Sequence, residues 1–350
     1  MHPRTPAGPM HRKFIKRLSV VTAVTLAAVL SACSGPAAAD TPVSRSGLFF
    51  DTVVTITLYD YEGSSDPILD ECMSMCEHYE SLLSPTVEGS DIWRINHSDT
   101  GPVAVDTETA ELLQTAIRYS EMSDGVLDLT IGGLCDLWDI DNLADTGTPV
   151  IPAQKDITEA LTHIDHGCVT VDDRKVTLSD PEACITLGFI AKGYVADRLE
   201  DVLRSQGVKS AMIDLGGNIE VIGRRPDGGD FRVGIQKPFA GRGESIAVTP
   251  VADGMSVVSS GTYERYFTVD GRIYHHILDT KTGYPADTGV IGVTVISDSS
   301  VEADALSTLC LLLGTDRGMD LIESLEDTEA LFITSDYDLM SSSGWKELTP

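Results

Sequence analysis

The sequence predicts an α+β fold in which largely antiparallel sheets pack against helices. Six segments enriched in β-branched residues predict strands, and six segments with apolar residues at three- and four-residue intervals predict helices. The helical segments do not alternate regularly with the strands, and short turns such as Asp270-Gly271 join some strands directly. This order favours an α+β body over a doubly wound parallel sheet.

The predicted elements cover most of the chain after residue 50. The strands are expected at residues 51–59, 209–213, 230–236, 255–259, 266–269 and 289–297. The helices are expected at residues 67–83, 106–122, 152–163, 191–206, 303–313 and 316–325. Gly216-Gly217 follows a predicted strand, but it lacks the GxGxxG spacing and does not open a helix, so a Rossmann dinucleotide site is excluded.

The N-terminal residues are typical of a secretory signal. Four basic residues precede an apolar run at residues 18–30, which is shorter than the roughly 20 residues of a transmembrane helix. The run ends on Leu30-Ser31-Ala32-Cys33, which resembles a bacterial lipobox. That resemblance implies cleavage after residue 32 and a lipid on Cys33, and an ordinary cleaved signal peptide is the alternative.

The segment after Cys33 sets the expected domain plan. Residues 33–46 are rich in small and polar residues and would form a flexible tether. Residues 47–350 would form the folded body, as one large domain or two closely joined lobes. The expected location is the outer face of the bacterial cytoplasmic membrane, or its periplasmic side, with the body held by the lipid.

The chain is strongly acidic, with 25 Lys and Arg against 54 Asp and Glu and a formal net charge of −29. Removal of residues 1–32 would take away five basic residues and no acid, which leaves about −34. Nucleic acid and anionic lipid are excluded as partners by this charge. A phosphate-bearing ligand would need a divalent cation or a local cluster of donors.

The six cysteines after Cys33 show no CxxC pair and no Cys/His zinc spacing. Cys72 and Cys76 lie four residues apart in a predicted helix and share a face, where a disulfide would be strained. Buried free thiols are therefore expected.

Two segments combine glycines with a polar residue in apolar surroundings. In SDGVLDLTIGGLCDLW (123–138), Asp128 is either a structural cap or a ligand contact, because a buried acid needs a partner. In LGFIAKGYVAD (187–197), Lys192 lies at the start of a predicted helix, where free backbone N–H groups favour a phosphate. A solvated lysine is the alternative.

Two further segments carry candidate acid–base and metal-binding groups. In YHHILDTKTGYP (274–285), a histidine with the nearby Asp279 is suited to taking a proton from a hydroxyl. Asp304 and Thr308 lie four residues apart on one helix face, and one carboxylate with one hydroxyl suits Mg²⁺. An aspartate favoured by the helix dipole is the alternative. VSSGTYER (258–265) is a weak signal by itself.

Taken in order, these segments resemble the successive signatures of the ApbE family, the FAD:protein FMN transferases, formerly called thiamine biosynthesis lipoproteins. IDLGGNIEVIG, SSGTYERY, ADALST and SDIWRIN fit the same series, and the resemblance runs from about Phe49 to beyond Leu313. It implies an ApbE-like, T-fold-like body, and makes residues 47–350 the transferase domain.

The resemblance implies a role for each candidate residue. His276 would be the catalytic base, and Asp304, Thr308 and the backbone carbonyl of Val195 would bind Mg²⁺. The residues expected to line the FAD site are Phe50, Val126, Leu127, Asp128, Lys192 and Leu278, with Arg198 added from its position just after the LGFIAKGYVAD segment. Four departures, at Phe50, Thr186, Thr262 and Thr280, affect the expected shape of the flavin pocket.

The implied reaction is Mg²⁺-dependent transfer of FMN from FAD to a Thr or Ser hydroxyl of an acceptor flavoprotein, with release of AMP. FAD is then a substrate, and the flavin supplies no redox chemistry. Two alternatives stay open at this point. One is an Mg²⁺-dependent FAD pyrophosphatase, and the other is a flavin-binding lipoprotein without catalysis.

Overall fold

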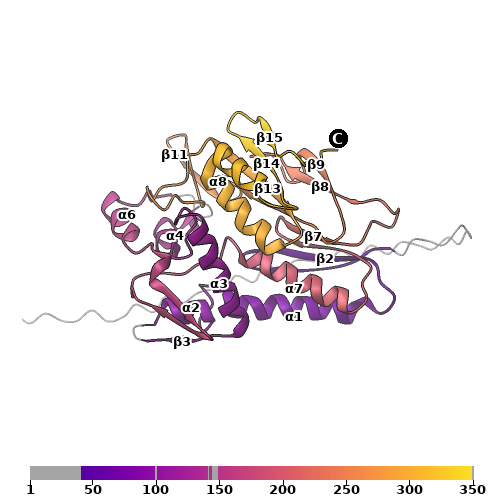
Figure 1. The fold of residues 1–350 in the computed structure, drawn as a ribbon, viewed down its shortest axis with the longest axis horizontal. Coiled ribbons are helices and arrows are strands. Elements are labelled where there is room, and N and C mark those ends of the chain that lie inside the picture. Colours follow the sequence, from indigo (N-terminus) through magenta and orange to yellow (C-terminus); the bar gives the residue numbers. More distant parts are fainter. Residues whose placement is uncertain (1–40, 99–100, 141, 144–148, 349–350) are drawn as a thin grey trace, which may run out of the picture. The chain divides into compact units, whose positions relative to one another are not determined.

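The computed structural model describes residues 41–98, 101–140, 142–143 and 149–348 (Figure 1). The predicted signal, the lipidation site at Cys33 and the predicted tether up to residue 40 lie outside the described residues. In the part of the chain that is described, no helix combines the length and the apolar character that a membrane crossing requires.

An eight-stranded sheet forms the centre of the fold, and all its neighbouring strands are antiparallel. In spatial order, its strands are β1 (Val43–Phe49), β2 (Thr52–Asp60), β6 (Ser210–Leu215), β7 (Asn218–Ile222), β10 (Ser256–Gly261), β13 (Val290–Ser297), β14 (Glu329–Thr334) and β15 (Leu339–Ser341). The predicted α+β class with largely antiparallel sheet is confirmed.

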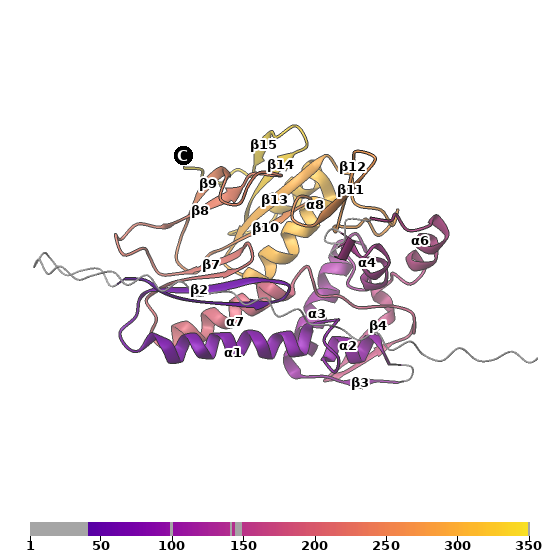
Figure 2. The ribbon, with the colours of Figure 1, turned by 180° about the vertical axis from the view of Figure 1, so that it is seen from behind.

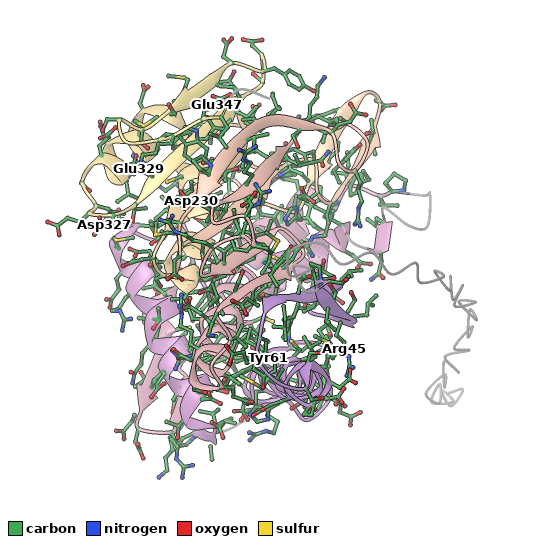
Figure 3. All side chains as sticks on the ribbon, turned by 90° about the vertical axis from the view of Figure 1, so that its right-hand side faces the viewer. Arg45, Tyr61, Asp230, Asp327, Glu329 and Glu347 are labelled. Carbon is green, nitrogen blue, oxygen red and sulfur yellow. The ribbon has the colours of Figure 1, made fainter. Side chains whose placement is uncertain are left out.

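Three helices cover one face of this sheet: α1 (Ser65–Leu83), α7 (Ala191–Ser205) and α8 (Ser300–Glu323). Figure 1 shows α8 in front of β13, with α7 and α1 below β2, and Figure 2 shows β10 and β13 in front of α8. Side chains of β2 point alternately toward these helices and toward the opposite face of the sheet. Ile56 of β2 and Leu199 of α7 belong to the same buried core. Arg45 of β1, labelled in Figure 3, ties the edge hairpin to α1 through ion pairs with Asp66 and Asp70.

A hairpin of β8 (Phe231–Gln236) and β9 (Ser245–Val251) covers the other face. Phe231 and Val233 of β8 join Val221 and Val257 of the sheet in a second core. The central strands are therefore buried on both faces, and their nearly continuous apolar sequences follow from this.

The remaining elements form the part of the body around α3. They are α2 (Asp91–Asn96), β3 (Val103–Ala104), α3 (Thr107–Met122), α4 (Gly132–Trp138), α6 (Gln154–Leu161), the 3₁₀ helix η1 (His166–Cys168), β4 (Val169–Asp172) and β5 (Lys175–Leu178). A two-stranded hairpin of β11 (Tyr266–Val269) and β12 (Arg272–His275) packs near them through a core around Trp138. Its turn residues Asp270 and Gly271 both have positive φ, as the predicted tight turn requires.

The structure corrects two predicted boundaries. Val43 to Ser46 were expected in the tether, but they pair with Leu58 to Thr55 and form the first part of β1. The two helices expected at residues 303–313 and 316–325 form one assigned helix, α8, interrupted at Gly314, whose φ of 76° breaks the helical backbone. Cys72 and Cys76 are buried free thiols, as expected.

Candidate functional site

Several turns and helix starts meet at one end of the central sheet. The β1–β2 turn at Phe50-Asp51 and the β6–β7 turn at Gly216-Gly217 lie together there, because Val54 pairs with Leu215 and a side chain on Gly216 would overlap Thr52. The end of β10 extends to the same edge, since Val258 pairs with Asn218. Residues far apart in sequence are thereby placed around one site.

The starts of α7 and α8 cross closely at this site. A Cβ atom on Gly193 would overlap the backbone of Ser300, so the close approach requires glycine. Asp304 is 3% exposed, and its Oδ2 accepts a hydrogen bond from the Gly193 N–H at 2.9 Å. The Lys192 Nζ lies 3.7 Å from the other oxygen, Oδ1. The structure thus brings Lys192, expected at the FAD site, next to Asp304, expected at the metal site.

Thr308 lies one turn after Asp304 and joins the same group through β10. The Ser260 hydroxyl is 3.0 Å from the Thr308 hydroxyl and 2.8 Å from that of Ser307. Ser260 and Ser307 were not predicted as site residues, although the SSG motif that contains Ser260 stood out in the sequence.

The structure does not bring the Val195 carbonyl to this group. Val195 is an interior residue of α7, where its carbonyl accepts the helix's own hydrogen bond from Leu199. The helix start offers a different oxygen. The Gly193 N–H donates to Asp304 rather than to the Phe189 carbonyl, and among the described residues no donor is bonded to that carbonyl.

These oxygens fit a small, hard cation. The described residues contain no group of three or more His, Cys, Asp or Glu that could hold a metal. One buried carboxylate, one hydroxyl and one carbonyl are instead a partial set for Mg²⁺, which fills its remaining positions with water and phosphate oxygens.

His276 has a fixed ring orientation. Its Nδ1 lies 3.2 Å from the Arg265 carbonyl, which also accepts the backbone N–H of His276 at 3.2 Å. Because a carbonyl can only accept, Nδ1 carries the proton and Nε2 carries the lone pair. Burial, and then the Arg265 guanidinium, lower the pKa of His276 to about 3. The ring is therefore neutral near pH 7, with its lone pair on Nε2.

The carboxylate near His276 in sequence has another task. Asp279 Oδ1 accepts the backbone N–H groups of Lys281 and Thr282 at 2.7 and 3.0 Å and so shapes the following turn. The expectation that Asp279 assists the histidine is wrong, because the Arg265 carbonyl orients that ring. His275 is buried and donates from Nε2 to the Ala286 carbonyl at 3.0 Å, which is a structural contact.

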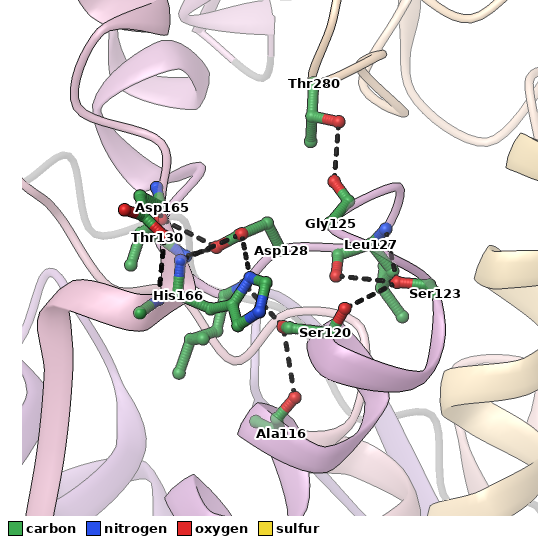
Figure 4. A network of polar contacts seen from close by, with 12 residues as sticks. Ala116, Ser120, Ser123, Gly125, Leu127, Asp128, Thr130, Asp165, His166 and Thr280 are labelled. Atoms are coloured by element: carbon green, nitrogen blue, oxygen red, sulfur yellow. Dashed lines mark hydrogen bonds and ion pairs between the residues drawn. The ribbon is translucent and has the colours of Figure 1, made fainter.

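The side chain of Asp128 is engaged within the protein (Figure 4). One oxygen accepts the Thr130 N–H and hydroxyl at 2.9 and 2.6 Å, and the other accepts the His166 N–H and Nδ1–H at 3.0 and 2.8 Å. The sequence left Asp128 as either a structural cap or a ligand contact, and its carboxylate has the structural role. His166 was missed, since it lies 38 residues away in sequence.

The loop before Asp128 is joined to the His276 segment. The Thr280 hydroxyl donates to the Gly125 carbonyl at 2.7 Å (Figure 4). The Ser123 hydroxyl accepts from the Leu127 N–H at 3.1 Å and donates to its carbonyl at 3.2 Å. Leu127 is buried, while Val126 is half-buried beside it.

Leu278 and Phe50, two other residues predicted to line the flavin site, differ in burial and in backbone conformation. Leu278 is buried in the core around Trp138 and forms a β-bridge with Pro285. Phe50 has a φ of 53°, which is uncommon for an aromatic residue, and its N–H donates to Glu80 Oε1 at 2.8 Å. Strain of this kind is concentrated at functional sites.

The structure does not bring Arg198 to the site. Six residues separate it from Lys192, which places it about 240° around α7 and nearly two turns along it. Its guanidinium lies over the Tyr194 ring and 3.3 Å from Asp201. Its assignment to the FAD site is therefore wrong.

A family model described as the ApbE family matches residues 50–332. The chain belongs to the ApbE family. The match includes each described segment that forms the site, from the β1–β2 turn to α8.

The ApbE relatives cover most of this chain. A protein named FAD:protein FMN transferase from Klebsiella pneumoniae (strain 342) is 35% identical over 303 residues, which are 86% of this chain and 92% of the relative. One of the same name from Treponema pallidum (strain Nichols) is 32% identical over 86% of this chain and 87% of the relative.

Solved ApbE structures share the fold. The crystal structure of the ApbE protein from Thermotoga maritima has a TM-score of 0.79 at 29% identity, over 87% of this chain and 97% of that chain. The flavin transferase ApbE from Vibrio cholerae has a TM-score of 0.75 at 29% identity, over the same shares. The predicted ApbE-like fold is confirmed.

Proposed function

We propose that this chain transfers FMN from FAD to a Thr or Ser hydroxyl of an acceptor protein and releases AMP. The names of the ApbE relatives support the reaction. The observation that carries it is the geometry of His276, a neutral imidazole whose Nδ1 is fixed by the Arg265 carbonyl and whose Nε2 is free to take a proton.

His276 Nε2 takes the proton of the acceptor hydroxyl as its oxygen attacks the FMN-side phosphorus of FAD. A new phosphorus–oxygen bond forms, the bond to the AMP-side oxygen breaks, and AMP leaves. Lys192 supplies positive charge within electrostatic range of His276 and of Asp304. Phosphoryl transfer of this kind depends mainly on positioning and charge stabilisation.

Asp304 and Thr308, with the Phe189 carbonyl in place of Val195, would hold Mg²⁺. When bound, Mg²⁺ neutralises charge on the pyrophosphate oxygens of FAD. An acidic chain needs this compensation more than most, because its net charge of −29 repels the substrate.

Lipid anchoring at Cys33 is part of the proposal. Its support is the LSAC sequence that ends the apolar run. After cleavage, the lipid would hold the body at the outer face of the cytoplasmic membrane. A Cys33→Ser variant should move the protein from the membrane fraction to the soluble fraction, and an unchanged distribution would contradict the anchor.

The reaction is tested by incubating the chain with FAD, Mg²⁺ and proteins secreted by the same cell. We expect flavin fluorescence on a denatured acceptor, AMP in equal amount, and FMN esterified to Thr or Ser by mass spectrometry. AMP and free FMN without labelled protein would indicate a pyrophosphatase instead.

His276→Asn separates catalysis from binding. The Asn amide can still donate to the Arg265 carbonyl, but it offers no base in place of Nε2. We expect the rate to fall at least about 100-fold while FAD still binds. The matched control is His78→Asn, because the His78 side chain is 53% exposed and distant in sequence from the site residues. FAD binding without AMP release in the wild-type chain would mean that the protein only binds flavin.

A further inference from the structure

The β8–β9 loop at residues 237–244 has a fixed conformation although most of it is exposed. The Gln236 side-chain amide donates to the carbonyls of Lys237 and Gly241 at 3.2 and 3.0 Å, and its oxygen accepts the Gly243 N–H at 3.2 Å. The loop ends are closed by the Lys237 N–H on the Glu244 carbonyl at 2.7 Å. The loop is therefore preorganised without a ligand.

Phe239 at the tip of this loop is exposed and strained. It has a φ of 59°, and 41% of its surface is exposed. Its ring meets Tyr263 and Tyr266 edge to face, with centroids 6.0 and 5.4 Å apart. A bulky residue persists in this backbone region only where its surroundings hold it, and here the neighbouring aromatic rings do so.

This tip borders the proposed base. Tyr266 directly follows Arg265, whose carbonyl holds the His276 ring, and it pairs with His275 across the β11–β12 hairpin. The exposed ring of Phe239 therefore lies against the segment that orients the proposed base, where it can contact an acceptor chain whose hydroxyl reaches His276.

Arg242 adds an uncommitted cation to the same loop. Among the described residues it forms no ion pair and no side-chain hydrogen bond. It lies within electrostatic range of Asp214, beside the β6–β7 turn, and of Glu264, next to Arg265. Arg242 therefore lies on the same exposed loop as Phe239 and can pair with a carboxylate from outside.

We propose that residues 237–244 dock the acceptor protein, with Phe239 contacting an apolar side chain and Arg242 pairing with a carboxylate close to the target Thr or Ser. This rests on the proposed transfer function. The partner is an extended acidic and apolar segment around the hydroxyl. Because the enzyme is acidic, most of its surface repels a carboxylate of the acceptor. A carboxylate can bind beside an unpaired cation such as Arg242, so Arg242 would determine which acceptor segments bind.

The test uses the full chain and an acceptor protein that the wild-type chain labels with FMN. We expect Arg242→Glu to lower kcat/KM for the acceptor at least 10-fold, and Phe239→Ser to raise the acceptor KM at least 10-fold. The KM for FAD and the slow release of AMP without acceptor should stay within twofold. Arg242→Lys should recover part of the loss.

Matched controls lie away from the loop. Arg232→Glu makes the same charge change on an exposed residue at the other end of the same hairpin, and Val87→Ser replaces an apolar residue that is 39% exposed. Both should leave the acceptor KM within twofold.

Two results would overturn the inference. An unchanged acceptor KM in both loop variants would remove the loop from the interface, and an equal rise in the KM for FAD would assign Arg242 to the FAD phosphates. If the wild-type chain labels no protein at all, the transfer function fails first, and this inference fails with it.

Discussion

At the residue scale, Asp128 holds two segments of the site in register, residues 128–130 and residues 165–166. Its two oxygens accept from Thr130 and His166, and the Thr130 hydroxyl in turn accepts the Asp165 N–H at 2.9 Å. Hydrogen bonds to a buried charged group each contribute about 1.5–3 kcal/mol. The loop expected to line the flavin site therefore depends on a carboxylate that is occupied by the protein's own donors.

Asp128→Asn should weaken FAD binding indirectly. An amide cannot accept at both positions, so one pair of donors loses its partner, and we expect unfolding to become easier by about 1–3 kcal/mol. The FAD KM should rise several-fold while kcat changes less, because His276 is untouched. Thermal unfolding and steady-state kinetics check both effects. Asp172→Asn, at an exposed position, is the control, and a fall in kcat alone would contradict a positioning role.

Residue assignments from sequence succeed where chain spacing and spatial spacing agree. Asp304 and Thr308 do lie on one face of α8, because four residues span about one helical turn. Val195 and Arg198 were misplaced, although both are close to Lys192 in the chain. The Val195 carbonyl is used by the hydrogen bonding of α7 itself, and the Arg198 side chain lies on another face of that helix. His166 could not be found, since its contact with Asp128 depends on folding.

At the element scale, α7 meets β7 through a buried group of acids. Glu220 of β7 is 1% exposed, and one of its oxygens has no hydrogen-bond partner among the described residues. Burial, and then the neighbouring Glu200 and Asp197 carboxylates, raise the pKa of Glu220 well above its ordinary value of 4.5. The native protein therefore keeps Glu220 protonated at neutral pH.

This protonation makes stability depend on pH. Above pH 4.5 the unfolded chain loses the Glu220 proton and the native protein keeps it, so this group lowers the free energy of unfolding as pH rises. Glu220→Gln removes that dependence, because the amide is neutral in both states. We expect the variant to gain stability over wild type by up to about 1.4 kcal/mol per pH unit between pH 5 and 8.

Chemical denaturation at several pH values measures the difference. Glu88→Gln, an exposed carboxyl, should show no such trend. A Glu220→Gln variant that loses stability equally at pH 5 and pH 8 would mean that the carboxyl is retained for its shape and not held in its neutral form.

Helices with strong periodicity were predicted, and several strands were not. The spacing of apolar residues located α1, α3, α7 and both parts of α8 to within a few residues. Strands such as β9 and β14 were missed, because their sequence pattern depends on the sheet face or the neighbour that covers them. The edge strand β1 was taken for part of a linker, since its outer side is exposed.

At the scale of the whole molecule, the site draws on residues from β1–β2 to α8. Phe50, Lys192, His276 and Thr308 come from segments spread over most of the folded body, so the intact body is needed to assemble them. The same body carries acids across its surface, such as Asp327 and Glu347 in Figure 3. A dianionic pyrophosphate must enter against this field.

Binding of FAD should therefore depend on Mg²⁺ more than on salt. With EDTA at constant ionic strength, we expect the FAD dissociation constant to rise at least 10-fold, which is about 1.4 kcal/mol. Asp304→Asn should bind FAD as weakly with Mg²⁺ as without it, because the buried carboxylate is the one charged ligand of the proposed site. NaCl added to the same ionic strength screens exposed charges but should not replace the cation. Equal FAD affinity with and without Mg²⁺ would show that Lys192 and the backbone donors are enough to bind the pyrophosphate.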